Sequence, residues 1–198
     1  MTSPTTDRPT AAASLPTQPG RGTTAALQQA AVVLVGHGGV PKDYPRDAVR
    51  RMKALEGQRA AHGGAPGEEE ARLEQRIRSW PRTPQNDPYQ VGIEGLASAL
   101  RARLRGVPLV VAYNEFCAPS LADAVDALVA DGVRTITVIP TMLTPGGSHS
   151  EIDIPEALAA LRARHPQAAL HYAWPVDVEL LAAMLADHLQ RANGGAPR

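Results

Sequence analysis

Short apolar runs alternate with amphipathic stretches along the chain, a pattern typical of α/β proteins. Apolar residues at helical spacing predict helices over about 91–105, 120–131, 155–164 and 177–192. Each follows a run rich in β-branched or apolar residues, and these runs predict four strands: 30–35 (AAVVLV), 108–113 (PLVVAY), 134–140 (RTITVIP) and 168–174 (AALHYAW). Because strands and helices alternate, we predict an α/β fold, a three-layer sandwich with a mainly parallel four-stranded sheet.

A long charged segment, about 43–89, follows the first strand pattern and contains no β-type run. Its composition predicts a helix over about 46–60, a glycine-rich break at 62–67 and a second helix over about 68–80. We therefore predict a helical insertion after the first strand.

The first residues differ in composition from the rest of the chain. Residues 1–26 are rich in Thr, Pro and Ala, which predicts a disordered N-terminal extension. An organelle transit peptide is an alternative, but four prolines would interrupt the amphipathic helix that it needs. The remaining residues, 27–198, have the length of a single domain.

Charge and cysteine content narrow the range of partners. The 20 basic and 20 acidic residues cancel, which argues against nucleic acid or an anionic membrane surface as a partner. We also expect no membrane span, because no apolar run approaches the roughly 20 residues that a membrane helix needs. The single cysteine, Cys117, excludes an internal disulfide and fits a reducing compartment, so we expect a cytoplasmic protein.

Two polar residues have the spacing of helix N-caps. Ser120 lies three residues before Asp123, and Asp153 lies three residues before Glu156, with a proline in the first turn. Both patterns predict capping boxes. Asp153 also lies four residues after His149, so an interaction with that histidine is the alternative.

Three side chains with metal-binding chemistry directly follow predicted strands. His37 lies in GHGG after the first strand, Glu115 follows the second, and His149 lies in a glycine-rich loop after the third. Because the carboxyl ends of parallel strands meet at one edge of a sheet, the three residues are expected to converge. Imidazole binds borderline divalent metals and accepts protons near neutral pH, so the set predicts an open metal site.

Each of these residues also has an ordinary interpretation. A single histidine is more often a loop or capping residue, and Glu115 can equally be a solvated loop acid. Cys117 is expected to be a small buried hydrophobe, with a thiolate ligand as the alternative. The other four histidines have no partner in local sequence and are interpreted as structural or solvent-facing: His62, His165, His171 and His188.

The proline-rich segment WPRTPQNDPY contains residues that could contact a flat ligand: Trp80, Arg82, Asn86 and Tyr89. A surface loop that packs its own aromatic side chains is the favoured interpretation. The chain has no P-loop, no GxGxxG fingerprint and no GxSxG nucleophile elbow, so a nucleotide cofactor is not indicated.

Three motifs together resemble the sirohydrochlorin chelatase family, the class II chelatases of the CbiX and SirB type. They are GHG after the first strand, Glu115 followed by PSL after the second, and PTMLTPGGSHSEIDIP after the third. The resemblance covers about 31–40 and 107–175. It implies that the protein inserts Co²⁺ or Fe²⁺ into sirohydrochlorin, for cobalamin or siroheme biosynthesis, without another cofactor; related archaeal members insert Ni²⁺.

The resemblance also implies roles for single residues. His37 and His149 correspond to the metal-binding and proton-accepting histidines, Glu115 to the acidic residue, and Asp153 to a support of the His149 loop. Members with one α/β unit associate in pairs, so a homodimer is implied. The helical insertion departs from the compact pattern. Arg46, Arg82 and helix N-termini are candidates for binding the carboxylates of the tetrapyrrole.

Two other functions compete with this one. A non-enzymatic tetrapyrrole or metal carrier on the same fold would bind ligand without turnover. A phosphatase that uses His37 as its nucleophile is disfavoured, because Gly36 occupies the position where such enzymes carry a phosphate-binding arginine.

Overall fold

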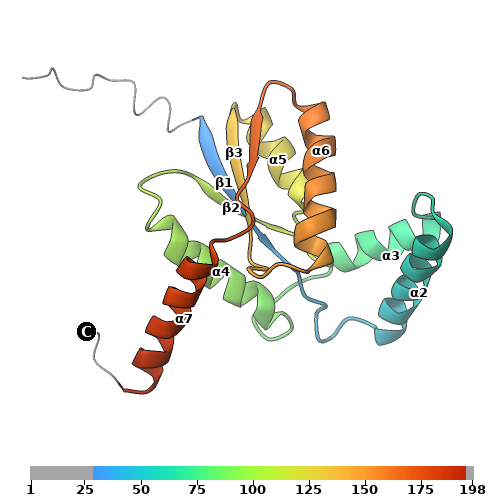
Figure 1. Ribbon diagram of the computed structural model, residues 1–198. Helices are drawn as coiled ribbons and strands as arrows, with labels where there is room; N and C mark the ends of the chain where they lie inside the picture. The colour runs from blue at the N-terminus through green and yellow to red at the C-terminus, as the bar shows by residue number, and fades with distance from the viewer. Residues whose placement is uncertain (1–28, 195–198) are drawn as a thin grey trace, which may run out of the picture.

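One parallel sheet organises the part of the chain that the computed structural model describes, residues 29–194; the predicted extension over 1–26 lies outside the described residues. The strand order is β2-β1-β3-β4, and all neighbours are parallel (Figure 1). The four strands are β1 (Ala30–Gly36), β2 (Leu109–Tyr113), β3 (Thr135–Pro140) and β4 (Ala169–Tyr172). The predicted α/β class with a parallel four-stranded sheet is confirmed.

Helices cover both faces of the sheet, which confirms the three layers. Val33 and Val35 of β1 pack in the core with α5 (Leu121–Ala130) and α6 (Ile154–Arg164). Leu34 points the other way and packs against α4 (Pro88–Arg101). This alternation follows from the two-residue period of a strand, and apolar residues on both sides explain why β1 reads as a continuous apolar run.

The segment 43–89, which we call the helical insertion, contains two packed helices beside the carboxyl end of the sheet (Figure 1). They are α2 (Arg46–His62) and α3 (Glu68–Arg78), separated by the predicted glycine-rich break. A small core of their own holds them to the loop after β2: Tyr44, Ala48, Met52, Ile77 and Phe116. The helical insertion is therefore attached to a loop that carries one of the candidate site residues.

The last helix, α7 (Val178–Ala192), carries apolar side chains that remain exposed. It extends away from the sheet (Figure 1). Five of its apolar side chains are between 51% and 70% exposed: Val178, Leu180, Met184, Leu185 and Leu189. Among the described residues, no helix is long and apolar enough to cross a membrane.

One of the two predicted capping boxes forms. The Ser120 hydroxyl accepts a hydrogen bond from the Asp123 amide at 3.1 Å, and the Asp123 carboxylate accepts one from the Ser120 amide at 2.9 Å. The prediction for Asp153 is wrong, because that residue has helical backbone angles and makes no side-chain cap. A π-helical turn runs directly into α6 at this point, so Asp153 is not at a helix start and its carboxylate is free to contact His149.

We predict that Ser120→Ala lowers the free energy of unfolding by about 1 kcal/mol near neutral pH. Hydrogen bonds from the Ser120 side chain and backbone hold the pKa of Asp123 below its usual value. A carboxyl group whose pKa is lower in the folded state stabilises above its unfolded pKa, and that contribution is lost as the pH falls through the folded pKa. Urea unfolding at about pH 7 and about pH 3 should therefore show a smaller effect of the substitution in acid.

Ser98→Ala, at an exposed position in α4, is the matched control and should be neutral or slightly stabilising. An effect of Ser120→Ala that is the same at both pH values would contradict the role of the Asp123 carboxylate.

Candidate metal centre

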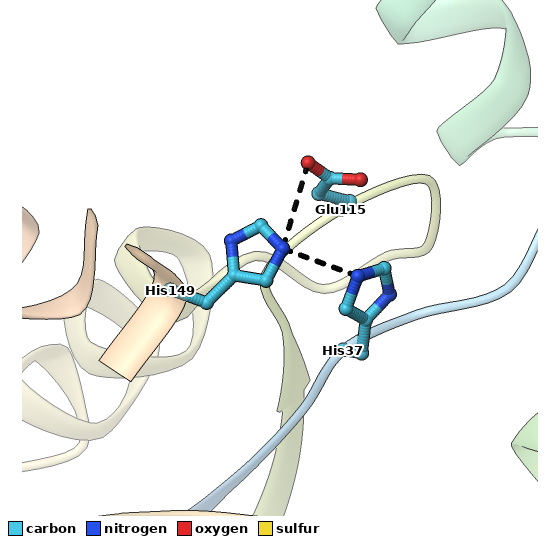
Figure 2. A group of neighbouring side chains, drawn as sticks. All are labelled: His37, Glu115 and His149. Carbon is cyan, nitrogen blue, oxygen red and sulfur yellow. Dashed lines mark hydrogen bonds and ion pairs between the residues drawn. The ribbon is translucent and has the colours of Figure 1, made fainter. Parts of the chain in front are cut away.

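The structure brings His37, Glu115 and His149 together at the carboxyl end of the sheet (Figure 2). One ligand atom from each lies within 4.8 Å of the others, and all three side chains are partly buried. The Nε2 atoms of the two histidines are 3.1 Å apart, and Glu115 Oε1 lies 3.9 Å from His149 Nε2. Three side chains from three different loops thus point at one spot that remains open to solvent.

The β1–β2 ladder continues beyond the strand ends and aligns two of these loops. The Asn114 amide donates to the carbonyl oxygen of Gly36 at 2.9 Å, and the Glu115 amide donates to that of His37 at 2.8 Å. The His37 amide in turn donates to the hydroxyl of Tyr89, at the start of α4, at 2.7 Å. Both loops are therefore held through their backbones, which leaves the side chains of His37 and Glu115 available for a ligand.

Gly38 allows the two loops to lie this close together. Its φ is +98°, in a region that favours glycine, and a Cβ there would lie 1.8 Å from the carbonyl oxygen of Glu115. No side chain can be accommodated against that backbone. The last glycine of the GHGG motif, Gly39, has no such conflict, with its nearest contacts at 3.3 Å.

His149 is oriented by residues on its own turn and on the β2 loop. It begins the π-helical turn His149–Asp153, and its Nδ1 lies 2.6 Å from Asp153 Oδ2 and 2.7 Å from Asn114 Nδ2. One ring nitrogen cannot donate to Asp153 and accept from Asn114 at once. Because a carboxylate is the stronger partner, Nδ1 carries the proton and donates to Asp153. The lone pair of His149 is then on Nε2, which faces His37.

His37 has the same tautomer. Its Nδ1 lies 2.8 Å from the carbonyl oxygen of Gly38, and because a carbonyl only accepts, Nδ1 must be the donor. The two Nε2 atoms, each with a lone pair, therefore lie 3.1 Å apart, and the rings meet at an angle, with an interplanar angle of 74°. With metal–nitrogen bonds of about 2.0–2.1 Å, this spacing corresponds to a nitrogen–metal–nitrogen angle of about 100°, near tetrahedral. The pair fits one divalent metal, with Glu115 as a third ligand after a small movement.

Arg82 does not face the site, so its prediction as a ligand for substrate carboxylates is wrong. Its side chain is only 7% exposed and forms an ion pair with Asp87, which is 2% exposed. The guanidinium also donates to the carbonyl oxygens of Gly39 and Phe116. A buried guanidinium that already has these partners ties the loops after β1 and β2 to the helical insertion. Arg46 is exposed at the start of α2, and its role stays a prediction.

The aromatic side chain of Trp80 in the proline-rich segment packs within the protein, as the surface-loop interpretation predicts. The ring of Trp80 packs edge-on against Tyr44 at 5.0 Å, and its Nε1 donates to Asp43 at 3.2 Å. Asn86 donates to the same carboxylate at 3.2 Å. The flat-ligand alternative is not supported for these side chains, because they are engaged with one another.

Cys117 is a buried hydrophobe, as expected. The side chain is 1% exposed, and burial raises the pKa of its thiol, which opposes the thiolate that metal binding needs. The remaining described histidines lie outside the three-residue cluster; His165, for example, pairs with Asp126 at 2.5 Å.

Sequence reasoning missed three residues that support the cluster. Asn114 directly precedes Glu115 at the end of β2, so its position was a usable signal. Tyr89 was considered only for a flat ligand, whereas its hydroxyl holds the backbone of His37. Lys53 in α2, whose Nζ lies 3.4 Å from Glu115 Oε2, has no signal in the local sequence.

Comparison with known proteins identifies the family of this chain. A model of the CbiX family matches residues 85–192, more than half of the chain. The chain belongs to the CbiX family. The region matched by the CbiX family includes Glu115 and His149, and it begins after His37 and after most of the helical insertion.

The similarity covers half or less of two relatives and nearly all of a third. The sirohydrochlorin cobaltochelatase of Priestia megaterium is 38% identical over 66 residues, which cover 33% of this chain but only 21% of that protein. A putative cobalamin biosynthesis CbiX protein of Marinobacter aquaeolei has a TM-score of 0.48 and 19% identity, over 82% of this chain and 98% of the other. The chelatase SirB of Bacillus subtilis, in complex with cobalt, has a TM-score of 0.41 and 20% identity. That match covers 82% of this chain and 50% of SirB.

We predict that Gly38→Ala disrupts the metal centre, because the new methyl group forces the Glu115 loop away from His37. Backbone strain from alanine at the positive φ of position 38 should lower the free energy of unfolding by about 1–3 kcal/mol. Co²⁺ binding, followed by calorimetric titration, should weaken at least about tenfold, a loss typical when the support of a metal ligand is removed.

Gly57→Ala is the control, because a Cβ at that position in α2 meets nothing within 4 Å. A folded Gly38→Ala variant that binds Co²⁺ as tightly as the wild type would show that this close approach is not needed.

Proposed function

We propose that this protein is a sirohydrochlorin chelatase that inserts a divalent metal, cobalt or iron, into the tetrapyrrole. The observation that carries the proposal is the pair of Nε2 atoms that lie 3.1 Å apart beside a carboxylate. Membership of the CbiX family adds to it, and so does the relative described as a sirohydrochlorin cobaltochelatase.

In this proposal, His37, His149 and Glu115 bind the incoming metal, which is a substrate. Asp153 accepts a hydrogen bond from Nδ1 of His149 at 2.6 Å, which fixes the ring orientation and makes Nε2 a better ligand. The carbonyl oxygen of Gly38 does the same for His37. Three ligands leave part of the coordination sphere of the metal open toward solvent, and that is the side from which a macrocycle can approach.

The proton balance fits the same residues. A divalent metal that enters the macrocycle displaces two protons from pyrrole nitrogens. As the metal leaves, the Nε2 atoms of His37 and His149 become free, and each can accept one proton. Two bases released in the step that liberates two protons make a further cofactor unnecessary. Glu115 stabilises the positive charge that develops on His149, because its Oε1 lies 3.9 Å from Nε2.

We predict that His149→Ala lowers the rate of metal insertion at least about 100-fold, because one substitution removes both a metal ligand and a proton acceptor. The measurement follows the visible spectrum of anaerobic sirohydrochlorin with Co²⁺, Fe²⁺ or Ni²⁺, and the wild-type rates rank the metals. His171→Ala is the control, since this histidine is exposed on β4, and it should keep the wild-type rate.

Wild-type protein that binds sirohydrochlorin and metal but inserts the metal no faster than the uncatalysed reaction would contradict the proposal. The carrier function would then be the better explanation.

We further propose a homodimer, located in the cytoplasm. The exposed apolar face of α7 supports the dimer, because five apolar side chains at 51–70% exposure represent a large area for one helix. Complete burial of a fully exposed side chain of this kind contributes about 1.5–3 kcal/mol, so burying each of these half-exposed side chains against a second copy would contribute less than that. The single buried thiol, Cys117, is consistent with a reducing compartment.

We predict that the double substitution Leu185→Glu and Leu189→Glu converts the dimer to a monomer, because two charges replace apolar side chains on the α7 face. Size-exclusion chromatography with light scattering measures the mass. Gln190→Glu changes the charge of the same helix at a polar position and should leave the dimer intact. A monomeric wild type at micromolar concentration would contradict the proposal.

A further inference from the structure

One cation of the helical insertion contacts the metal centre directly. The Nζ of Lys53 in α2 lies 3.4 Å from Glu115 Oε2, whereas the other carboxylate oxygen, Oε1, faces His149. Glu115 is therefore shared between a lysine on one side and the two histidines on the other. The carboxylate is 26% exposed and the lysine 45%, so the pair lies at the rim of the centre.

The position of Lys53 is determined by its surroundings. Glu56, one turn later in α2, holds Nζ at 2.9 Å, and Nζ stands 4.8 Å from the ring centroid of Phe116. Phe116 belongs to the core of the helical insertion and directly follows Glu115 in the chain. The ammonium group is thus held on the Glu115 loop by a second carboxylate and an aromatic face.

The helical insertion also braces the backbone of this loop. Arg78, at the end of α3, donates to the carbonyl oxygens of Cys117 at 3.0 Å and Asn114 at 3.3 Å. A cavity of about 380 Å³ between the helical insertion and the centre is lined by Glu56, Glu115 and Asp153 among others. Arg78 thus holds the backbone of the loop, and the Glu115 side chain borders the cavity.

From these contacts we propose that Lys53 is a positioning residue that competes with the divalent metal for Glu115. The inference rests on the proposed function, because it assumes that the metal is a substrate that must be released. Without metal, Lys53 holds the Glu115 carboxylate by an ion pair, within reach of the histidines. When the metal binds Oε1, the negative charge of Glu115 is shared between the metal and Lys53, and the small movement toward the metal stretches the contact of Oε2 with Nζ. Both effects weaken the ion pair, and that loss weakens the hold of the centre on the metal.

This competition suits a site that transfers its metal. If two imidazoles and one carboxylate bound the metal with no competing partner, their affinity would oppose its transfer to the macrocycle. A lysine beside the carboxylate offers the ligand an alternative partner as the metal leaves, so Glu115 returns to an ion pair and not to an unpaired state. Lys53 thereby favours release as well as positioning Glu115.

Lys53→Met tests the inference, because methionine keeps an unbranched apolar chain against Phe116 and removes the charge. We expect Co²⁺ alone to bind about two- to fivefold more tightly in calorimetric titration, the range expected for losing one partly exposed ion pair. In the chelatase assay the KM for Co²⁺ should fall while kcat does not rise. Lys53→Arg should resemble the wild type.

The chain has only one other lysine, Lys42, which supplies a control with the same change of charge. Lys42→Met should leave Co²⁺ affinity unchanged. An unchanged or weaker affinity in Lys53→Met would overturn the inference, because weaker binding would mean that Lys53 only supports Glu115.

A double-mutant cycle with Glu115→Gln separates competition from simple charge repulsion. If Lys53 acts through Glu115, Lys53→Met has little effect on Co²⁺ affinity in the Glu115→Gln background. An equal gain in both backgrounds would overturn the inference. Because these titrations use Co²⁺ without tetrapyrrole, a protein that binds Co²⁺ but fails to insert it would contradict the proposed function and leave this test interpretable.

Discussion

Parallel pairing of β1 with both of its neighbours is the constraint on which the cluster of His37, Glu115 and His149 depends. Val35 pairs with Ala112 on one side and with Pro140 on the other, so strands β1, β2 and β3 end at nearly the same position along the sheet. The pairing continues past the strands, where the Glu115 amide meets the carbonyl oxygen of His37. A shift of one residue in this register would turn a ligand away from the cluster, because successive side chains point to opposite faces.

The helical insertion extends this constraint from the sheet to the loops. Arg78 and Arg82 bind carbonyl oxygens of the loop after β2, and Arg82 also binds the loop after β1. Phe116 inserts into the core between α2 and α3. Burying the Arg82–Asp87 pair costs desolvation, which its several hydrogen bonds offset. Through these hydrogen bonds, the pair holds the backbones of the loops after β1 and β2 in one arrangement, although surface loops are usually mobile.

Much of this arrangement follows from sequence patterns, and the rest depends on tertiary contacts. The strands, the helices and the meeting of His37, Glu115 and His149 could be predicted, because apolar periodicity defines the elements and parallel strand ends share one edge. The partners of single polar side chains could not. The sequence around Arg82 does not show that Asp87 and two carbonyl oxygens surround its side chain. Asp153 has the spacing of an N-cap, but a π-helical turn precedes α6, so the residue does not lie at a helix start.

The central position of β1 also affects how the chain folds during its synthesis. This strand comes first in the described chain, but both of its partners come much later, and His37 lies 112 residues before His149. Pairings between such distant segments form slowly during folding. A nascent chain therefore carries β1 as an unpaired apolar segment, prone to aggregation, until β2 and β3 have been synthesised. The three side chains of the candidate centre therefore come together only in an already assembled sheet.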